Sequence, residues 1–140
     1  MQTLEATMFQ VYSPELLDHF EHPRNPGVVD SPDASAQVEN PVCGDVLALT
    51  ARIGEERISE IKFLAKGCVP AMACASALTD LVKGRTIQEA KALKSEQLRN
   101  AVGHLPPASD HAAQLAIDAL AALLKHSGTP QATGRAPSGQ

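Results

Sequence analysis

The sequence contains no tryptophan, and aromatic residues make up only 3% of its 140 residues. Hydrophobic residues as a whole make up 44%, so we expect a core built from aliphatic side chains and alanine. A chain of this length can bury such a core as one domain without disulfides or structural metals.

Long apolar runs and clusters of basic residues are also missing. No run approaches the length that spans a membrane, and Met1–Glu5 lacks the basic start and apolar stretch of a signal peptide. We therefore expect a cytoplasmic protein. The formal charge of −4, without clustered Lys or Arg, argues against nucleic acid or an anionic membrane as its partner.

Cysteine is scarce, because the chain has only Cys43, Cys68 and Cys74. Disulfides are not expected in a reducing cytoplasm. Separated thiols in such a protein are buried core residues, metal ligands or nucleophiles.

One helix is predicted near the start of the chain. Ser13 followed by Pro14 is typical of a helix N-terminus, and Pro23 is expected to end the helix. His19 and His22 are interpreted as part of its solvated face rather than as half of a metal site.

Strands are predicted in the middle of the chain. Residues 30–36 are expected to be irregular. Alternation of buried and exposed positions in residues 47–53 and 61–66 indicates two half-buried strands. The turn signal at residues 54–56 predicts that they form an antiparallel hairpin. Residues 37–39 are expected to add a third strand.

The second half of the chain is predicted to be helical. Pro70 suits the first residue of a helix, and Thr86 with Glu89 forms the capping box of another. The last helix is expected to start at Ser109 or Asp110. The expected helices occupy roughly residues 70–83, 86–93, 95–102 and 110–126.

Strands followed by helices indicate an α+β fold, with a small three-stranded antiparallel sheet and helices packed on one face. We expect residues 1–126 to form one domain. Residues 127–140 are rich in Gly, Pro, Ser and Thr and are expected to form a disordered tail.

The predicted hairpin brings potential metal ligands to one end of the sheet. Cys43 and Asp45 precede the first strand, and Cys68 follows the second, so pairing of the strands places them close together. Cys68 also lies at a predicted helix N-terminus, which stabilises a thiolate. Thiolates favour zinc, copper(I) and iron–sulfur clusters. We interpret these residues, with His111, as one open metal site.

Each of these residues also has a simpler structural explanation. A buried cysteine behaves as a small hydrophobic residue, and Asp45 could bond its own backbone in a turn. His111 could be a surface residue in a first helical turn. Cys74 shares a helical face with Ala71 and Leu78, as a core residue would.

Several motifs resemble one known family. They are, in chain order, Leu16-Leu17-Asp18-His19-Phe20-Glu21-His22-Pro23-Arg24-Asn25-Pro26-Gly27, Asn40-Pro41-Val42-Cys43-Gly44-Asp45, Phe63-Leu64-Ala65-Lys66-Gly67-Cys68, Lys83-Gly84-Arg85-Thr86, and Leu105-Pro106-Pro107 followed by His111 and Leu115-Ala116. Their order and spacing over roughly residues 12–125 resemble the NifU/IscU-type, or SufU-like, iron–sulfur cluster assembly scaffolds.

The resemblance implies a scaffold rather than an enzyme. Such a protein receives sulfur as persulfide from a cysteine desulfurase, holds a transient iron–sulfur cluster and passes it to acceptor proteins. The cluster is expected to be [2Fe–2S] rather than [4Fe–4S], with zinc as an alternative in the purified protein. Cys43, Cys68 and His111 are the implied ligands, and Asp45 is an oxygen ligand or a group that keeps the cluster labile.

One departure from the family pattern concerns the ligands. The family's third cysteine directly follows the histidine, and here that position is Ala112. We predict that the extra thiol of Cys74 replaces it. The predicted set is therefore Cys43, Cys68, Cys74 and His111, with Asp45 as the alternative fourth ligand.

A second departure concerns partners. One branch of the family carries the chaperone motif Leu-Pro-Pro-Val-Lys, whereas Leu105–Ser109 here reads Leu-Pro-Pro-Ala-Ser. The resemblance therefore does not extend to recruitment of an Hsp70-type chaperone. The sequence leaves open whether the protein forms a homodimer.

Three other functions would use the same residues. The protein could be a zinc-binding sulfur acceptor for a cysteine desulfurase, which the sequence does not separate from a cluster scaffold. It could be a structural zinc domain. It could also be a thiol enzyme with Cys68 as nucleophile and His111 as base, but no segment resembles an oxyanion hole.

Overall fold

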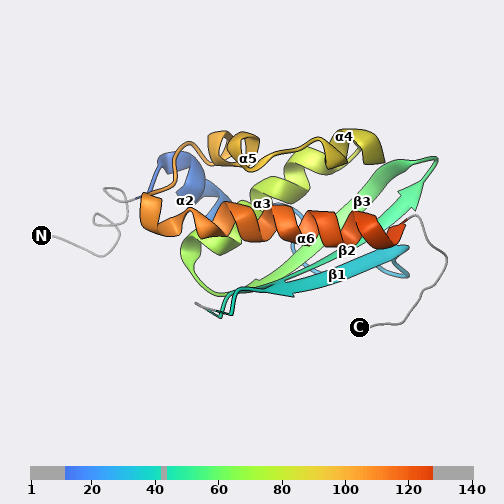
Figure 1. Cartoon of the computed structure of the whole chain (residues 1–140), viewed down its shortest axis with the longest axis horizontal. Helices are drawn as coiled ribbons and strands as arrows, with labels where there is room; N and C mark the ends of the chain where they lie inside the picture. Colours follow the sequence, from blue (N-terminus) through green and yellow to red (C-terminus); the bar gives the residue numbers. More distant parts are fainter. Residues whose placement is uncertain (1–11, 42–43, 128–140) are drawn as a thin grey trace, which may run out of the picture.

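A computed structural model describes residues 12–41 and 44–127. The elements in these ranges are α2 (Pro14–Glu21), β1 (Ala34–Glu39), β2 (Val46–Gly54), β3 (Arg57–Lys66), α3 (Val69–Val82), α4 (Ile87–Lys91), α5 (Ser95–Ala101), the 3-10 turn η1 (Pro107–Ser109) and α6 (His111–Ser127). Figure 1 shows the strands side by side, with α3 and α6 running along the sheet. This arrangement confirms the predicted α+β fold.

The sheet has the order β1-β2-β3 and is antiparallel throughout. A two-residue turn joins β2 to β3, and both of its residues, Glu55 and Glu56, have positive φ angles of 55° and 61°. Turns with two positive φ angles match the twist of a hairpin. The predicted hairpin is therefore confirmed. Its inward side chains, such as Leu49 and Ile61, are fully buried.

The third strand is longer than the sequence indicated. Residues 30–36 were expected to be irregular, but β1 begins at Ala34, which pairs with Ala51 of β2. The edge of β2 presents backbone donors and acceptors that need partners. Backbone pairing, rather than a side-chain pattern, therefore decides where β1 starts. Ala34 is buried, and α6 packs across β1 and β2.

Helix α3 lies at the centre of the molecule, in contact with α2, β3 and α6. Most of its side chains are buried, and many are alanines, which let neighbouring elements approach closely. Cys68 is its N-cap residue, as the predicted helix N-terminus implied, and Pro70 is its second residue rather than its first, because the helix begins at Val69. Helix α6 begins at His111, after η1, slightly later than predicted. His111 is therefore the first residue of that helix.

His19 does not belong to a solvated face, which corrects the sequence-based interpretation. It is 9% exposed, and its Nδ1 lies 2.8 Å from the Ser76 hydroxyl oxygen of α3. The backbone N–H of Arg24 donates to the same oxygen at 2.8 Å. Burial lowers the pKa of His19, and the positive charge of Arg24 lowers it further. By contrast, the side chain of His22 is 74% exposed.

We expect the protein to lose stability as the pH falls below about 6.5, the usual pKa of an unfolded-state histidine. Between that value and the lower native pKa of His19, the unfolded chain binds a proton that the native state resists. The loss from this group is at most about 1.4 kcal/mol per pH unit. Denaturant unfolding at a series of pH values measures it.

The variant His19→Asn provides the comparison, because its amide can still reach Ser76 but does not titrate. We expect its unfolding free energy to depend less steeply on pH than that of the wild type. His104 is exposed, so His104→Asn should keep the wild-type dependence. Equal slopes for the wild type and His19→Asn would contradict this account.

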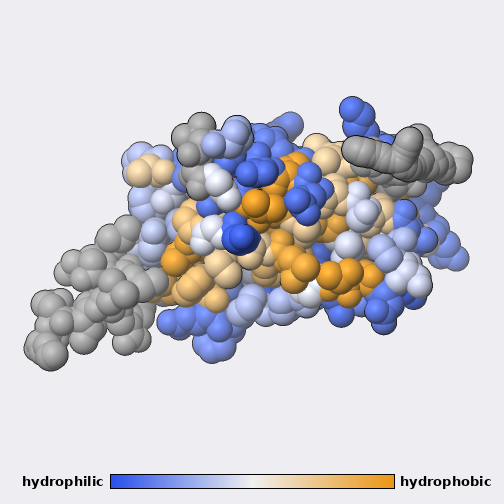
Figure 2. Space-filling view, turned by 90° about the horizontal axis from the view of Figure 1, so that it is seen from below, coloured by the Kyte–Doolittle hydropathy of each residue, from blue (hydrophilic) through white to orange (hydrophobic). Residues whose placement is uncertain are grey.

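Apolar side chains also reach the surface. Figure 2 shows a band of hydrophobic residues across the middle of one face, with hydrophilic residues around its edges. Among the described residues, the large hydrophobic side chains exposed most are Val28 and Leu64, at 54% and 53%. None of the helices within residues 12–41 and 44–127 is both long and apolar enough to cross a bilayer.

Candidate metal centre

The open end of the β2–β3 hairpin brings two parts of the sequence together. Val46, the first residue of β2, pairs with Lys66, the last residue of β3. Asp45 directly precedes β2, while Gly67 and Cys68 directly follow β3. The strand register therefore places Asp45 beside Cys68, as the hairpin predicted.

The carboxylate of Asp45 lies at the centre of the site. Its Oδ1 accepts a hydrogen bond from the backbone N–H of Cys68 at 3.1 Å. Its Oδ2 lies 3.2 Å from Sγ of Cys68 and 3.4 Å from Nε2 of His111. Asp45 is only 2% exposed. A carboxylate removed from water needs such partners, so Asp45 links the hairpin to the start of α6.

Gly67 leaves the space that this carboxylate occupies. A Cβ atom at position 67 would lie 2.1 Å from Oδ1 of Asp45, and the φ angle of Gly67 is +147°. Any larger residue would displace the carboxylate or the turn. The sequence pattern did not reveal this role of Gly67. A glycine between a strand and a potential ligand was the available signal.

Cys68 and His111 are both presented by the starts of helices. Cys68 is the N-cap of α3, but its side chain makes no capping hydrogen bond. The side chain of His111 is 35% exposed, yet its Nε2 is buried and has no hydrogen-bond partner within the described part of the chain. Its described polar neighbour is Oδ2 of Asp45 at 3.4 Å, so a metal ion held with Asp45 would give this buried nitrogen the partner that such atoms usually have.

The three side chains could hold one metal ion. One ligand atom from each of Asp45, Cys68 and His111 lies within 4.8 Å of the other two. Zinc accepts sulfur, nitrogen and oxygen ligands of this kind, and thiolates with imidazoles also hold iron in clusters. The residues therefore fit either metal, and three protein ligands leave a position for a fourth.

Of the other two cysteines, only Cys74 lies within the described residues. Cys43 lies outside the described residues, so its role as a ligand stays a prediction. Cys74 is fully buried within α3. Burial raises the pKa of its thiol to about 12, and nearby negative charge on Cys68 and Asp110 contributes. Metal ligation requires the thiolate. The described group of potential ligands does not include Cys74.

Comparison with known sequences assigns a family. The family described as NifU-like N-terminal domain matches residues 11–132. The chain belongs to this family. The iron–sulfur cluster assembly scaffold protein IscU 1 of Archaeoglobus fulgidus is 40% identical over 110 residues, which cover 79% of this chain and 72% of that protein. IscU of Azotobacter vinelandii is 39% identical over 118 residues, covering 81% and 91%.

A solved structure shares the fold of this NifU-like domain. The N-terminal part of a nitrogen-fixing NifU-like protein from Brucella abortus superimposes with a TM-score of 0.70, at 20% sequence identity. The match covers 86% of this chain and 96% of that one. It supports the arrangement of the sheet and helices that holds the site.

Ala112 directly follows His111 in the NifU-like domain described here. It is 1% exposed and packs in the core, and its methyl group offers no ligand atom. The described ligand atoms of the site are therefore one sulfur, one nitrogen and one carboxylate oxygen.

Proposed function

We propose that the protein is a scaffold on which an iron–sulfur cluster is assembled and from which it is transferred. The observation that carries this proposal is the convergence of Asp45, Cys68 and His111 at the end of the hairpin, in a chain of the NifU-like family. The relatives from Archaeoglobus fulgidus and Azotobacter vinelandii are named as iron–sulfur cluster assembly scaffolds, which supports the same role here.

In this proposal, sulfur arrives as persulfide from a cysteine desulfurase, and acceptor proteins receive the finished cluster. The protein acts in the cytoplasm as a carrier rather than as an enzyme. The partial exposure of Cys68 and His111 supports this role, because a cluster that must leave again needs access to partner proteins.

We further propose that Asp45, rather than Cys74, completes the ligand set with Cys43, Cys68 and His111. The carboxylate of Asp45 already contacts both of the other described ligands. Cys74 is buried, and its raised pKa keeps its proton in place. From the sequence, Cys74 was the predicted ligand and Asp45 the alternative, and the contacts of Asp45 support the alternative.

A second candidate function is that of a zinc-binding sulfur acceptor for a cysteine desulfurase. The observation that favours it is Ala112, where the family pattern has a thiol. One carboxylate and one imidazole beside a thiolate form a site that zinc fills readily. Such a site would hold the metal permanently and use it to position the persulfide.

Anaerobic reconstitution tests these proposals. The purified protein is incubated with a cysteine desulfurase, cysteine and ferrous iron, and then iron, zinc and acid-labile sulfide are measured. A scaffold is expected to gain iron and sulfide together and to lose both to an acceptor apoprotein. Zinc that persists without any bound sulfide would favour the second candidate instead.

Two cysteine variants identify the ligands in the same experiment. Cys68→Ala is expected to lose the bound iron and sulfide. Cys74→Ala also removes one thiol and is therefore the matched control, and it should keep the wild-type stoichiometry. If Cys74→Ala loses the cluster while its circular dichroism spectrum is unchanged, then Cys74 is a ligand, and the proposal that Asp45 takes its place in the ligand set is wrong.

A further inference from the structure

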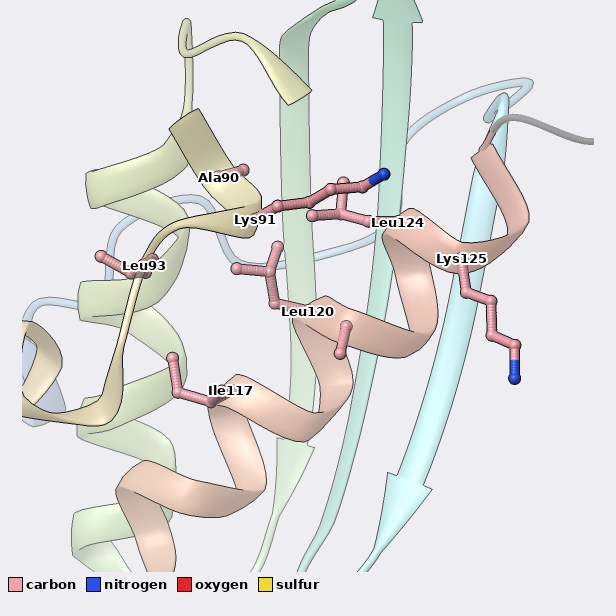
Figure 3. A pocket seen from close by; sticks show the side chains of 8 residues that line it. Ala90, Lys91, Leu93, Ile117, Leu120, Leu124 and Lys125 are labelled. Carbon is pink, nitrogen blue, oxygen red and sulfur yellow. The ribbon is translucent and has the colours of Figure 1, made fainter. Parts of the chain in front are cut away.

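A groove lies between α6 and the segment that contains α4, away from the metal centre (Figure 3). Its volume is about 340 Å³. The residues that line it are Ala90, Lys91, Leu93, Ile117, Leu120, Ala121, Leu124 and Lys125. Six of these side chains are apolar and the other two are lysines, so the groove combines an apolar floor with positive charge.

Helix α6 contributes a regular apolar stripe to the groove. Ile117, Leu120, Ala121 and Leu124 follow the i, i+3, i+4, i+7 spacing of one helix face. Leu120 and Leu124 are buried and form the floor, whereas Ile117 is half-buried and Ala121 is exposed. This face can therefore receive another helix, because ridges of this spacing interdigitate between packed helices.

The charge at the groove has one sign. Lys91 extends from the end of α4 toward Leu124, and Lys125 projects outward from α6 (Figure 3). None of the described residues that line the groove is acidic. Neither lysine forms an ion pair with any residue in the described ranges. A bound segment with carboxylates beside its apolar side chains would therefore meet complementary charge.

We propose that this groove docks an acidic amphipathic helix of a partner protein. The apolar side chains of the helix would lie on Ile117, Leu120 and Leu124, and its carboxylates would face Lys91 and Lys125. Small-molecule sites normally add several fixed polar groups to an apolar wall. Here the charged groups among the described lining residues are two lysines on flexible stems, which suits the helix-in-groove mode of recognition instead.

The docking site is separate from the metal centre. At about 1.5 Å of rise per residue, Ile117 and Leu124 lie roughly 9 and 20 Å along α6 from His111. A partner held in the groove would therefore leave the partly exposed Cys68 uncovered. The proposal does not depend on which metal or cluster the site carries.

Titration of a designed peptide into the isotope-labelled full chain tests the proposal by NMR. The peptide is about 14 residues long, roughly four helical turns, with Leu at i, i+3, i+4 and i+7 and with Glu and Ala elsewhere. A matched peptide has Lys in place of Glu. We expect the acidic peptide to shift the methyl signals of Leu93, Ile117 and Leu120 and to bind at least about tenfold more tightly than the basic one.

Variants of the protein sharpen the result. The double variant Lys91→Glu, Lys125→Glu should prefer the basic peptide, and Ile117→Gln should weaken binding of the acidic one. Leu64→Gln alters an exposed residue of β3 outside the groove and should bind like the wild type. Equal binding of both peptides, or no methyl shifts with the acidic peptide, would overturn the proposal. It would also be overturned if octanoate shifts these methyls and the acidic peptide does not.

Discussion

Replacing Gly67 with alanine is expected to separate the ligands of the metal centre and to weaken zinc binding about 10- to 100-fold, the usual effect of losing a group that orients a ligand. The new Cβ would lie 2.1 Å from Oδ1 of Asp45, so either the carboxylate or the turn before Cys68 must move. An L-residue held at a φ of +147° also costs about 1–3 kcal/mol of stability. Competition with a chromophoric chelator measures the affinity.

Gly84→Ala separates backbone strain from the loss of space. Gly84 has a φ of +84°, but a Cβ there would meet no atom within 4 Å. That variant should lose stability in denaturant and keep the wild-type affinity for zinc. If Gly67→Ala bound zinc as tightly as the wild type, the space beside Asp45 would have no part in holding the site together.

The variant Asp45→Asn is expected to bind zinc or ferrous iron at least about 100-fold more weakly than the wild type. At an effective dielectric constant of about 20, unit charges 4 Å apart interact by about 4 kcal/mol, and a divalent cation interacts with the carboxylate more strongly still. The asparagine oxygen can still accept the hydrogen bond from the backbone of Cys68. The change therefore removes the charge and keeps the turn.

Asp118→Asn is the matched control for this charge change. Asp118 is an exposed residue of α6, and its neutralisation alters the net charge by the same amount. Its metal affinity should equal that of the wild type. Unchanged affinity in Asp45→Asn would exclude the carboxylate as a ligand and return Cys74 to that position.

Local patterns in the sequence predicted the part of the site that depends on the hairpin. The alternation around Leu49 and Phe63 indicates two strands, and the turn at residues 54–56 joins them. Once the strands pair, the register alone places Asp45 beside Cys68. The start of the first helix was also predictable from a local pattern, because it depends on the adjacent residues Ser13 and Pro14.

The predictions for His19 and for the start of β1 were wrong because the residues that they contact are distant in the sequence. Nothing near His19 indicates that its ring meets Ser76, 57 residues further along the chain. Ala34 begins a strand because Ala51 is its partner, while its own neighbours are polar. Contact with a remote segment can bury a residue or extend a strand without any periodic pattern of apolar residues around the affected position.

The sequence by itself determined the family, the hairpin and the residue types available to bind a metal, since these follow from short-range patterns and spacing. Only the tertiary structure decided how those residues are arranged and which of them are buried. Helical periodicity places Cys74 on an apolar face of α3, but packing against that face removes its thiol from water and raises its pKa. The space beside Gly67 lets the carboxylate of Asp45 lie next to Cys68 and His111. These contacts could not be predicted locally, because the position of a side chain depends on atoms from distant parts of the sequence.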